Sequence, residues 1–334
     1  MKAVHALAER IRRGEPIPLP IAALLTAATP FQRFGMWRRL NGPRVRLKGP
    51  RPGLKARVIS FGNLTAGGTG KTPAVIERAR AETAAGKRVA VLTRGYGRKW
   101  VPAETLADEP ALIARLVPGV TIMQSADRVA AGRKAIEDYG CDTLILDDGF
   151  QYVRLERDEN VLLVDATNPF GTGRLVPRGI LREPVESAAR ATHLVVTRCD
   201  QAAALDFLLA TLKRLCPGAP IRLTRHAPAR LWRVSSQAGL PLEALRGQEV
   251  TALCGIANPE SFFATLEGLG VVVRERRAFP DHAAIPDDAL PRSGVIVTTE
   301  KDAVRLQDAR HVGGVQDNVL ALGIELQDFT RPEP

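Results

Sequence analysis

The sequence predicts an α/β protein built on a doubly wound, mostly parallel sheet of the P-loop NTPase type, with a second, smaller α/β domain. Residues 57–86 read as a strand, a glycine-rich loop and a helix that begins at Lys71-Thr72. After this unit, apolar runs that end in polar residues alternate with helical stretches, which is the order expected of a parallel sheet. A further β-α-β pattern starts near residue 230, and 334 residues suffice for two cores.

The glycine-rich loop is the most informative stretch. It follows the apolar run Val58–Phe61 and consists of Thr65, Ala66, Gly67, Gly68, Thr69, Gly70, Lys71 and Thr72. Glycines let backbone N–H groups gather around phosphate oxygens, and the helix N-terminus adds a favourable dipole. Lys71 is expected to reach the β- and γ-phosphates, and Thr72 to offer its hydroxyl to Mg²⁺. Thr65 stands where a glycine is usual; a simple turn before an ordinary helix is the alternative, and the combined pattern favours a nucleoside triphosphate site.

A second strand, residues 88–93, runs into a basic glycine turn that begins at Arg94. Ligands of open α/β sheets bind beyond such strand ends. A loop at 107–110 leads into a helix that ends near residue 116, and a strand at 120–123 precedes a helix at 129–138.

The expected strand 142–146, whose last three residues are apolar, ends in Asp147-Asp148-Gly149-Phe150-Gln151. Downstream of a P-loop, such a carboxylate indicates a Walker B strand whose Asp lies near Mg²⁺ or its waters. Asp147 and Asp148 are both candidates, and the order of their distances to the metal stays open. A plain strand-ending turn is the alternative.

The rest of the chain supplies the remaining strands and loops. Strands are expected at 160–165, 193–200, 221–223, 231–234, 271–273 and 294–299, together with a strand and turn at 249–257 and a helix at 259–269. Arg174, Arg178 and Arg182 in the loop 169–184 suggest an anion-binding rim. Residues 298–302 read as a helix N-cap followed by a solvated first turn. His282, taken alone, reads as a surface histidine.

The N-terminal region combines apolar and basic residues. Residues 1–20 read as a short polar helix, and 21–31 as an apolar segment broken at Pro30. Arg33, Arg38 and Arg39 follow it, with Phe34 and Trp37 between them. The pattern suits attachment to an anionic membrane surface, and equally a helix that packs on the protein's own core. The sequence shows neither a secretory signal nor an apolar run long enough to span a bilayer.

Charge and cysteine usage narrow the setting. The formal net charge of +11 and the pI near 10.0 favour an anionic partner: nucleic acid, a membrane face or a phosphorylated substrate. The cysteines are widely spaced and lack a C-x-x-C pair, so we expect a reduced interior and no zinc site.

Three classes of P-loop protein compete. Thr197-Arg198-Cys199-Asp200 loosely matches the guanine-reading motif of a switch GTPase, but Arg replaces Lys and Phe150 occupies a required glycine position. An ATPase acting on nucleic acid would explain the charge, yet no nucleic-acid fold signature is present. A kinase with an anionic substrate accounts for the P-loop, the Asp pair and the basic N-terminus together.

The chain resembles the tetraacyldisaccharide 4'-kinase family of lipid A biosynthesis over nearly its whole length. The motifs that carry the resemblance are Asn63–Pro73, Thr93–Arg98, Asp108-Glu109-Pro110, Ala126-Asp127-Arg128, Leu146–Gln151, Leu181–Pro184 and Thr298–Asp302. The resemblance implies transfer of the ATP γ-phosphate to the 4'-hydroxyl of a tetraacylated glucosamine disaccharide 1-phosphate, which gives lipid IVA. It also implies a monotopic enzyme on the cytoplasmic face of the bacterial inner membrane. The alternative is a P-loop GTPase or ATPase switch at the membrane or on nucleic acid.

The resemblance also implies roles for individual residues. Asp108 is the implied general base, with His282 tuning it, and Lys71 contacts the phosphates. Glu109 joins Thr72 and Asp147 as an implied Mg²⁺ ligand. Asp147, Asp148 and Gln151 shape the nucleotide site, while Arg94, Arg128 and Arg182 are candidate contacts for the anionic substrate.

We therefore expect three segments. Residues 1–50 form an amphipathic, basic, membrane-associating segment, 51–225 a P-loop kinase domain, and 226–334 a smaller α/β domain that closes over the active site. The expected ligands are ATP, Mg²⁺ and the lipid A disaccharide precursor, and the expected surface is the anionic inner membrane. Nucleic acid is not expected, and no obligate protein partner is evident.

Overall fold

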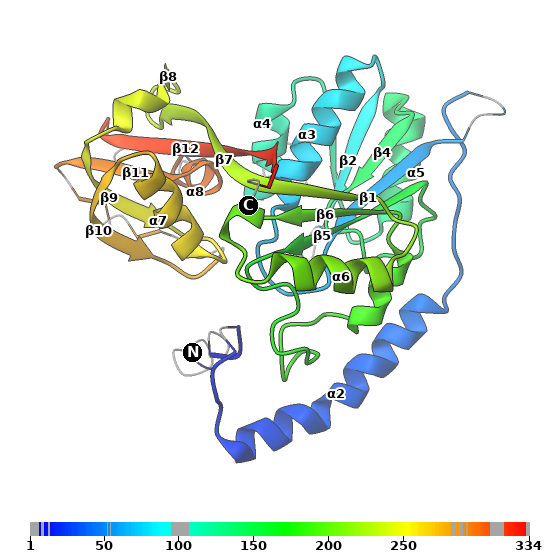
Figure 1. Ribbon diagram of the computed structural model, residues 1–334. Helices are drawn as coiled ribbons and strands as arrows, with labels where there is room; N and C mark the ends of the chain where they lie inside the picture. The colour runs from blue at the N-terminus through cyan, green and yellow to red at the C-terminus, as the bar shows by residue number, and fades with distance from the viewer. Residues whose placement is uncertain are drawn as a thin grey trace. The chain divides into compact units, whose positions relative to one another are not determined.

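The computed structural model describes residues 7, 10–12, 14–51, 53, 55–94, 107–281, 283, 285–286, 290–291, 293–307 and 317–331. The chain divides into two compact units. The first unit is Met1–Val101, Gly119–Arg225 and Asp328–Pro334, and the second unit is Pro102–Pro118 and His226–Gln327. Figure 1 shows the helices and strands of each unit.

The first unit contains a parallel sheet with the strand order β7-β6-β5-β1-β4-β2-β3. Its strands are β1 (Arg57–Gly62), β2 (Val89–Thr93), β3 (Thr121–Gln124), β4 (Thr143–Leu146), β5 (Glu159–Asp165), β6 (His193–Thr197) and the start of β7 (Ile221–Arg233). Every residue of β2 and β4 is buried, as expected of parallel strands with both faces covered. The expected fold class is confirmed.

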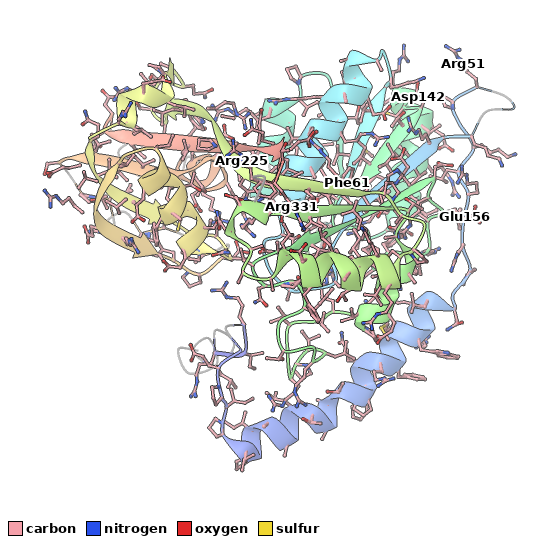
Figure 2. All side chains as sticks on the ribbon, viewed as in Figure 1. Arg51, Phe61, Asp142, Glu156, Arg225 and Arg331 are labelled. Carbon is pink, nitrogen blue, oxygen red and sulfur yellow. The ribbon has the colours of Figure 1, made fainter. Side chains whose placement is uncertain are left out.

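Helices α3 (Lys71–Ala84), α5 (Arg128–Tyr139) and α6 (Leu205–Leu215) pack on this sheet, together with the short turns η2 (Val185–Arg190) and η3 (Cys199–Gln201). One apolar cluster joins α5 to β1, β2 and β4, and another joins α6 to β5 and β6. Phe61, labelled in Figure 2, lies in β1 and is buried. All four cysteines are buried too.

The loops after three of the strands meet at one edge of the sheet. Because the carboxyl ends of parallel strands lie at the same edge, the loops after β1, β4 and β6 lie together there. These loops carry the glycine-rich segment, the Asp147-Asp148 pair and Arg198.

Helix α2 (Leu19–Leu40) is continuous, so the predicted break at Pro30 is wrong. Proline removes one backbone N–H from the helix ladder, but here the segments on both sides remain helical. Ala22 is buried, and Gln32 donates to the Arg182 carbonyl oxygen at 3.2 Å, so α2 contacts the loop that carries Arg182 in the same unit. Within the described residues, no helix has both the length and the apolar character needed to cross a membrane.

The second unit has the strand order β10-β9-β11-β12-β7, with β8 antiparallel to β7. Its elements are α4 (Asp108–Leu116), the end of β7, β8 (Gly239–Leu240), η4 (Leu242–Leu245), β9 (Glu249–Cys254), α7 (Pro259–Gly268), β10 (Val272–Ala278), β11 (Val295–Thr299), α8 (Glu300–Gln307) and β12 (Val319–Asp328). Among the described residues, its core contains one apolar cluster under α7 and another under α8.

Three features differ from the expectations. Residues 221–223 and 231–234 were expected as separate strands, but β7 runs without a break from Ile221 to Arg233. Strand β12 was not anticipated. The segment 102–118, expected within 51–225, groups with the second unit because α4 packs against α8.

Candidate active site

The glycine-rich loop has the backbone geometry that a phosphate site needs. Gly70 adopts a left-handed conformation with φ of 83°, and α3 begins at the next residue, Lys71. Side chains rarely adopt this conformation, so glycine permits the sharp entry into the helix. Where β1 ends, a Cβ on Gly62 would lie 2.6 Å from that of Phe150, so only glycine allows the loops after β1 and β4 to approach this closely.

Four polar side chains meet between these two loops. The Lys71 ammonium lies 3.2 Å from Asn63 Oδ1 and 3.7 Å from Asp148 Oδ1. Arg182 donates to both Asp148 oxygens, at 2.6 and 2.9 Å, and its Nη1 also lies 3.4 Å from Asn63 Oδ1. Two cations around one carboxylate leave a net positive charge, which suits the binding of a polyphosphate.

Asp148 is held in an uncommon conformation, with φ of 52°. Aspartate tolerates this left-handed backbone region better than most residues other than glycine. It is still an uncommon conformation for aspartate, and such conformations concentrate at sites of function or strain. Burial alone would raise the pKa of Asp148, but Lys71, and then Arg182, outweigh it and hold the pKa well below its ordinary value. The carboxylate is therefore ionised at neutral pH.

The donor set for a divalent cation consists of oxygen atoms. Asp147 is buried at the end of β4, and Thr72 lies in the first turn of α3. Within the described residues, no group of three or more His, Cys, Asp or Glu could hold a metal without other ligands. This fits Mg²⁺, which takes one or two protein oxygens and completes its shell with substrate phosphates and water. Thr69 Oγ1 is buried without a protein partner and is one more oxygen that a ligand could satisfy.

Three further predicted residues belong to the first unit. Gln151 donates to the Asn63 carbonyl oxygen at 2.9 Å, while its own Oε1 is buried without a partner. Arg128 is buried, with its guanidinium 5.1 Å from the centre of the Tyr152 ring, and its Nε has no hydrogen-bond partner. Burial lowers the pKa of Arg128, and Tyr152, Asp148 and Asp147 only partly offset this effect. Arg94 is exposed just after β2.

Asp108 belongs to the second unit, where it is the first residue of α4 rather than part of a loop. Arg305 of α8 forms a short ion pair with Asp108 through Nε and contacts Asp302 at 2.9 Å through Nη1. Asp302 is fully buried and also accepts from the Gly255 N–H at 3.0 Å. Arg305 is thus fixed on one side by the core and presents its guanidinium to Asp108.

Glu109 has a similar arrangement. Lys301 of α8 lies 3.1 Å from Glu109 and 2.9 Å from Asp281. Burial would lower the pKa of Lys301, but Glu109 and then Asp281 outweigh this effect and raise it. His282 lies outside the described residues.

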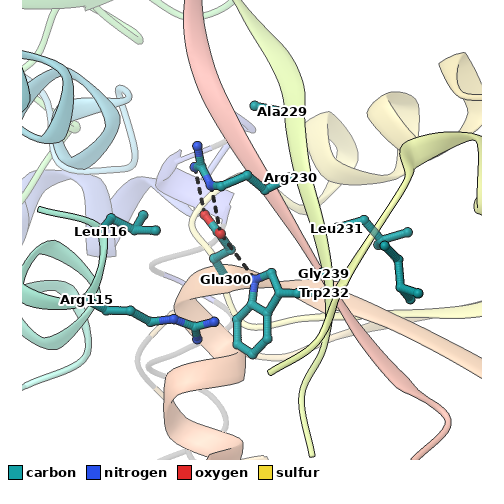
Figure 3. A pocket seen from close by; sticks show the side chains of 9 residues that line it. Arg115, Leu116, Ala229, Arg230, Leu231, Trp232, Gly239 and Glu300 are labelled. Atoms are coloured by element: carbon teal, nitrogen blue, oxygen red, sulfur yellow. Dashed lines mark hydrogen bonds and ion pairs between the residues drawn. The ribbon is translucent and has the colours of Figure 1, made fainter. Parts of the chain in front are cut away.

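The solvated first turn predicted for residues 298–302 is wrong, because Glu300 and Asp302 are buried. Glu300 accepts from Arg230 at 3.1 and 3.0 Å and from Trp232 Nε1 at 3.2 Å (Figure 3). These side chains line a cavity of about 370 Å³, at whose wall the Arg115 guanidinium lies 3.5 Å from the centre of the Trp232 ring. Arg115 of α4 is therefore linked to Glu300, the first residue of α8, through Trp232.

Sequence reasoning gave no role to Asn63, Lys301, Arg305, Thr197 or Arg198 in a kinase site. Asn63 had a usable signal, because it is a polar residue directly after a buried strand that leads into a P-loop. Arg305 had none, since its contact with Asp108 joins residues 197 positions apart.

Comparison with known proteins identifies related chains. The family model described as Tetraacyldisaccharide-1-P 4'-kinase matches residues 21–332. A tetraacyldisaccharide 4'-kinase from Anaeromyxobacter dehalogenans strain 2CP-C is 41% identical over 333 residues, which cover 92% of this chain and 87% of that relative. The corresponding protein from Pelobacter propionicus is 39% identical over 328 residues, covering 90% and 88%.

A solved structure agrees with these matches. It is that of LpxK from Aquifex aeolicus in complex with ATP, which is 31% identical to this chain and superimposes with a TM-score of 0.68. The comparison covers 93% of this chain and 94% of that one.

Proposed function

The chain belongs to the tetraacyldisaccharide-1-P 4'-kinase family and is a kinase, and from this premise we propose the reaction and the role of each residue. The proposed reaction transfers the γ-phosphate of ATP to the 4'-hydroxyl of a tetraacylated glucosamine disaccharide 1-phosphate, giving lipid IVA. The observation that carries it is the cluster of Lys71, Asn63, Asp148 and Arg182 at the loop ends of β1 and β4.

The glycine-rich loop and Lys71 would hold the phosphates of ATP. Lys71 is already aligned by Asn63 and Asp148, so its ammonium needs little reorganisation to meet an incoming phosphate. In phosphoryl transfer the protein contributes mainly positioning and charge stabilisation, and a preoriented cation supplies both. Asp148 and Gln151 support this geometry through Arg182 and Asn63.

Thr72 and Asp147 would hold Mg²⁺ together with the phosphates, with Glu109 as a further candidate ligand. When bound, the cation would neutralise charge on the phosphate oxygens. Glu109 would have to exchange or share its contact with Lys301 to reach it.

Asp108 is the proposed general base for the sugar hydroxyl. An alcohol has a pKa far above neutrality, so a carboxylate that accepts its proton as the bond to phosphorus forms lowers the barrier. The ion pair with Arg305 fixes the orientation of the Asp108 carboxylate at the start of α4. His282 is the proposed partner that tunes this base.

Three arginines are proposed contacts for the substrate. Arg128 and Arg182 would meet the 1-phosphate of the acceptor or the transferred phosphoryl group, and Arg94 would extend this positive surface. Planar guanidinium groups suit bidentate contact with phosphate. Arg128 carries a buried N–H without a partner, which supports a ligand-binding role.

We also propose that α2 rests on the anionic cytoplasmic face of the inner membrane. Its exposed side carries large apolar residues, including Leu24 at 71% and Phe31 at 81% exposure, and the rings of Phe34 and Trp37 are stacked at 6.2 Å. Arg33, Arg38 and Arg39 lie among them and are exposed. Apolar and basic residues together suit a surface of anionic lipid.

The deciding experiment supplies purified protein with Mg²⁺, labelled ATP and the tetraacyl disaccharide 1-phosphate. We expect label in a product phosphorylated at the 4'-position, and no such product from the Lys71→Ala variant. ATP hydrolysis that proceeds equally well without the acceptor would instead favour a nucleotide switch. An acceptor that lacks the 4'-hydroxyl serves as the matched control and should remain unlabelled.

A further inference from the structure

Two carbonyl oxygens of the glycine-rich loop accept hydrogen bonds from side chains at the end of β6. Arg198 donates to the Gly68 carbonyl oxygen through Nη1 and Nη2, at 3.2 and 3.1 Å. Thr197 Oγ1 donates to the Thr69 carbonyl oxygen at 3.1 Å. Two adjacent residues of one strand end therefore hold two consecutive peptide groups of the loop.

This arrangement fixes the direction of the N–H groups. In a trans peptide the C=O of one residue and the N–H of the next point in opposite directions. Anchoring the Gly68 and Thr69 carbonyls on the side of β6 therefore turns the N–H groups of Thr69 and Gly70 away from it. Asn63 Nδ2 lies 3.4 Å from the Gly67 carbonyl oxygen, so the Gly68 N–H is oriented by the same rule. Successive N–H groups oriented in this way form an anion-binding nest.

Arg198 is itself held rigidly. It forms a short buried ion pair with Asp165 at the end of β5, with side-chain exposures of 6% and 11%. Asp165 also accepts from the N–H and hydroxyl of Thr167, at 3.0 and 2.7 Å. Arg198 adopts φ of 53°, an uncommon conformation for a long side chain that marks functional positions. A buried ion pair contributes little net stability, because the cost of removing two charges from water offsets their attraction. Stability alone therefore does not explain why Arg198 and Asp165 are paired here.

We propose that Arg198 and Thr197 are positioning residues for the nucleotide: they hold the loop carbonyls so that the N–H groups of Thr69 and Gly70 are oriented toward the phosphates before ATP arrives. This role replaces guanine reading as the explanation of Thr197-Arg198-Cys199-Asp200. It rests on nucleotide binding at the proposed P-loop site and is independent of the acceptor.

The test measures the Kd of ADP and of ATP by calorimetry in the absence of acceptor, with thermal unfolding alongside. Arg198→Met should raise the Kd of both nucleotides about tenfold or more, because a charge-assisted hydrogen-bond donor to the loop is lost. Thr197→Val keeps the shape of the side chain but removes the hydroxyl, and it should raise the Kd of both nucleotides roughly threefold to tenfold. Arg198→Lys retains a cationic donor and should restore part of the affinity.

The matched control is Arg78→Met. Arg78 also forms a partly buried ion-pair network, with Glu82 and Glu159, but Glu159 pairs with the beginning of β1 rather than with the loop end. The Arg78→Met variant should lower the melting temperature and leave the Kd of ADP and of ATP unchanged.

The proposal is overturned if folded Arg198→Met and Thr197→Val proteins bind ADP as tightly as wild type. It is also overturned if they lose only thermal stability, as the control does. Should Arg198→Met fail to fold, Thr197→Val and Arg198→Lys decide the question. A wild-type protein that binds no ADP would refute the nucleotide site itself, which is a separate result.

Discussion

Asp148 shows how one residue organises the proposed phosphate end of the site. Its left-handed backbone turns the carboxylate toward Lys71 and Arg182, and these two cations keep it ionised. The arrangement holds both cations in place without a ligand, so that less order has to be created when a polyphosphate binds.

Lys71→Ala should remove most of the phosphoryl transfer while the protein stays folded. In the proposed site the ammonium would meet the charge that develops on the phosphates, and the loss of one such preorganised group lowers kcat by about 10²–10³-fold. Thr72→Ala should have a comparable effect through the metal. Steady-state kinetics with circular dichroism as the folding check measure both. A folded Lys71→Ala enzyme with near-wild-type turnover would contradict the P-loop assignment.

Asp148→Asn tests the charge cluster through pH. The pKa of Asp148 is below the ordinary value in the folded protein, so its ionisation stabilises the fold above the unfolded-state pKa of about 4. This contribution is lost as the pH falls through the folded-state pKa. The variant, whose side chain also tolerates a positive φ, should be less stable than wild type at pH 7, and the difference should shrink between about pH 4 and 2.

Urea unfolding at a series of pH values measures this difference. The control is Asp206→Asn, which changes a largely exposed carboxylate of α6 that forms an ion pair with Arg331 at the surface. A difference for Asp148→Asn that stays constant down to pH 2 would exclude the proposed role of the ion pairs.

At the scale of elements, the success of sequence reasoning depended on how local the determinants were. The P-loop and the Asp147-Asp148 turn were predictable because strand, loop and helix signals lie within a few residues of one another. The burial of Glu300 and Asp302 was not predictable, because it depends on contacts with Arg230, Trp232 and Arg305. Helix α2 was only partly predictable, since the run continues through Pro30.

Helix α2 should attach the protein to anionic vesicles in a salt-dependent way. Replacing Arg33, Arg38 and Arg39 with Gln should shift protein to the soluble fraction, because each basic residue near such a surface contributes about 1 kcal/mol. Binding of the wild type should weaken as salt rises, since screening acts on exposed charges. Vesicle sedimentation at several salt concentrations measures this.

The control for that experiment carries the same charge change elsewhere. Arg274, Arg276 and Arg277 of β10 pair with glutamates, and their replacement by Gln lowers the net charge equally. This control should still bind. Equal partitioning of wild type and the α2 variant at all salt concentrations would indicate that α2 only packs on the rest of the first unit.

At the scale of the whole molecule, the candidate groups divide between two compact units. Lys71, Asp147, Asp148 and Arg182 belong to the first, and Asp108 and Glu109 to the second. Two α/β units were predictable from the order of strands and helices. That α4 groups with the second unit was not, because its packing on α8 joins segments far apart in the chain. The closing of residues 226–334 over the active site remains a prediction.

This division makes the roles of nucleotide binding and proton transfer separable. Asp108→Asn should lower kcat severely and leave the Kd of ATP unchanged, because the lost interaction matters mainly in the transition state and belongs to the unit without the P-loop. Wild-type activity should fall on the acid side as the base is protonated. That limb is not expected to report Asp148, whose pKa is held well below its ordinary value.

The partner of the base is tested by a double-mutant cycle. His282→Ala should cost less than Asp108→Asn, and the two defects should not add if the residues act as a unit. Arg305→Lys keeps a cation next to Asp108 and should retain more activity than Arg305→Met, which leaves the carboxylate without this partner. Measured kcat values for the single and double variants decide the pairing. Full additivity would exclude His282 as the partner, and an active Asp108→Asn enzyme would exclude Asp108 as the base.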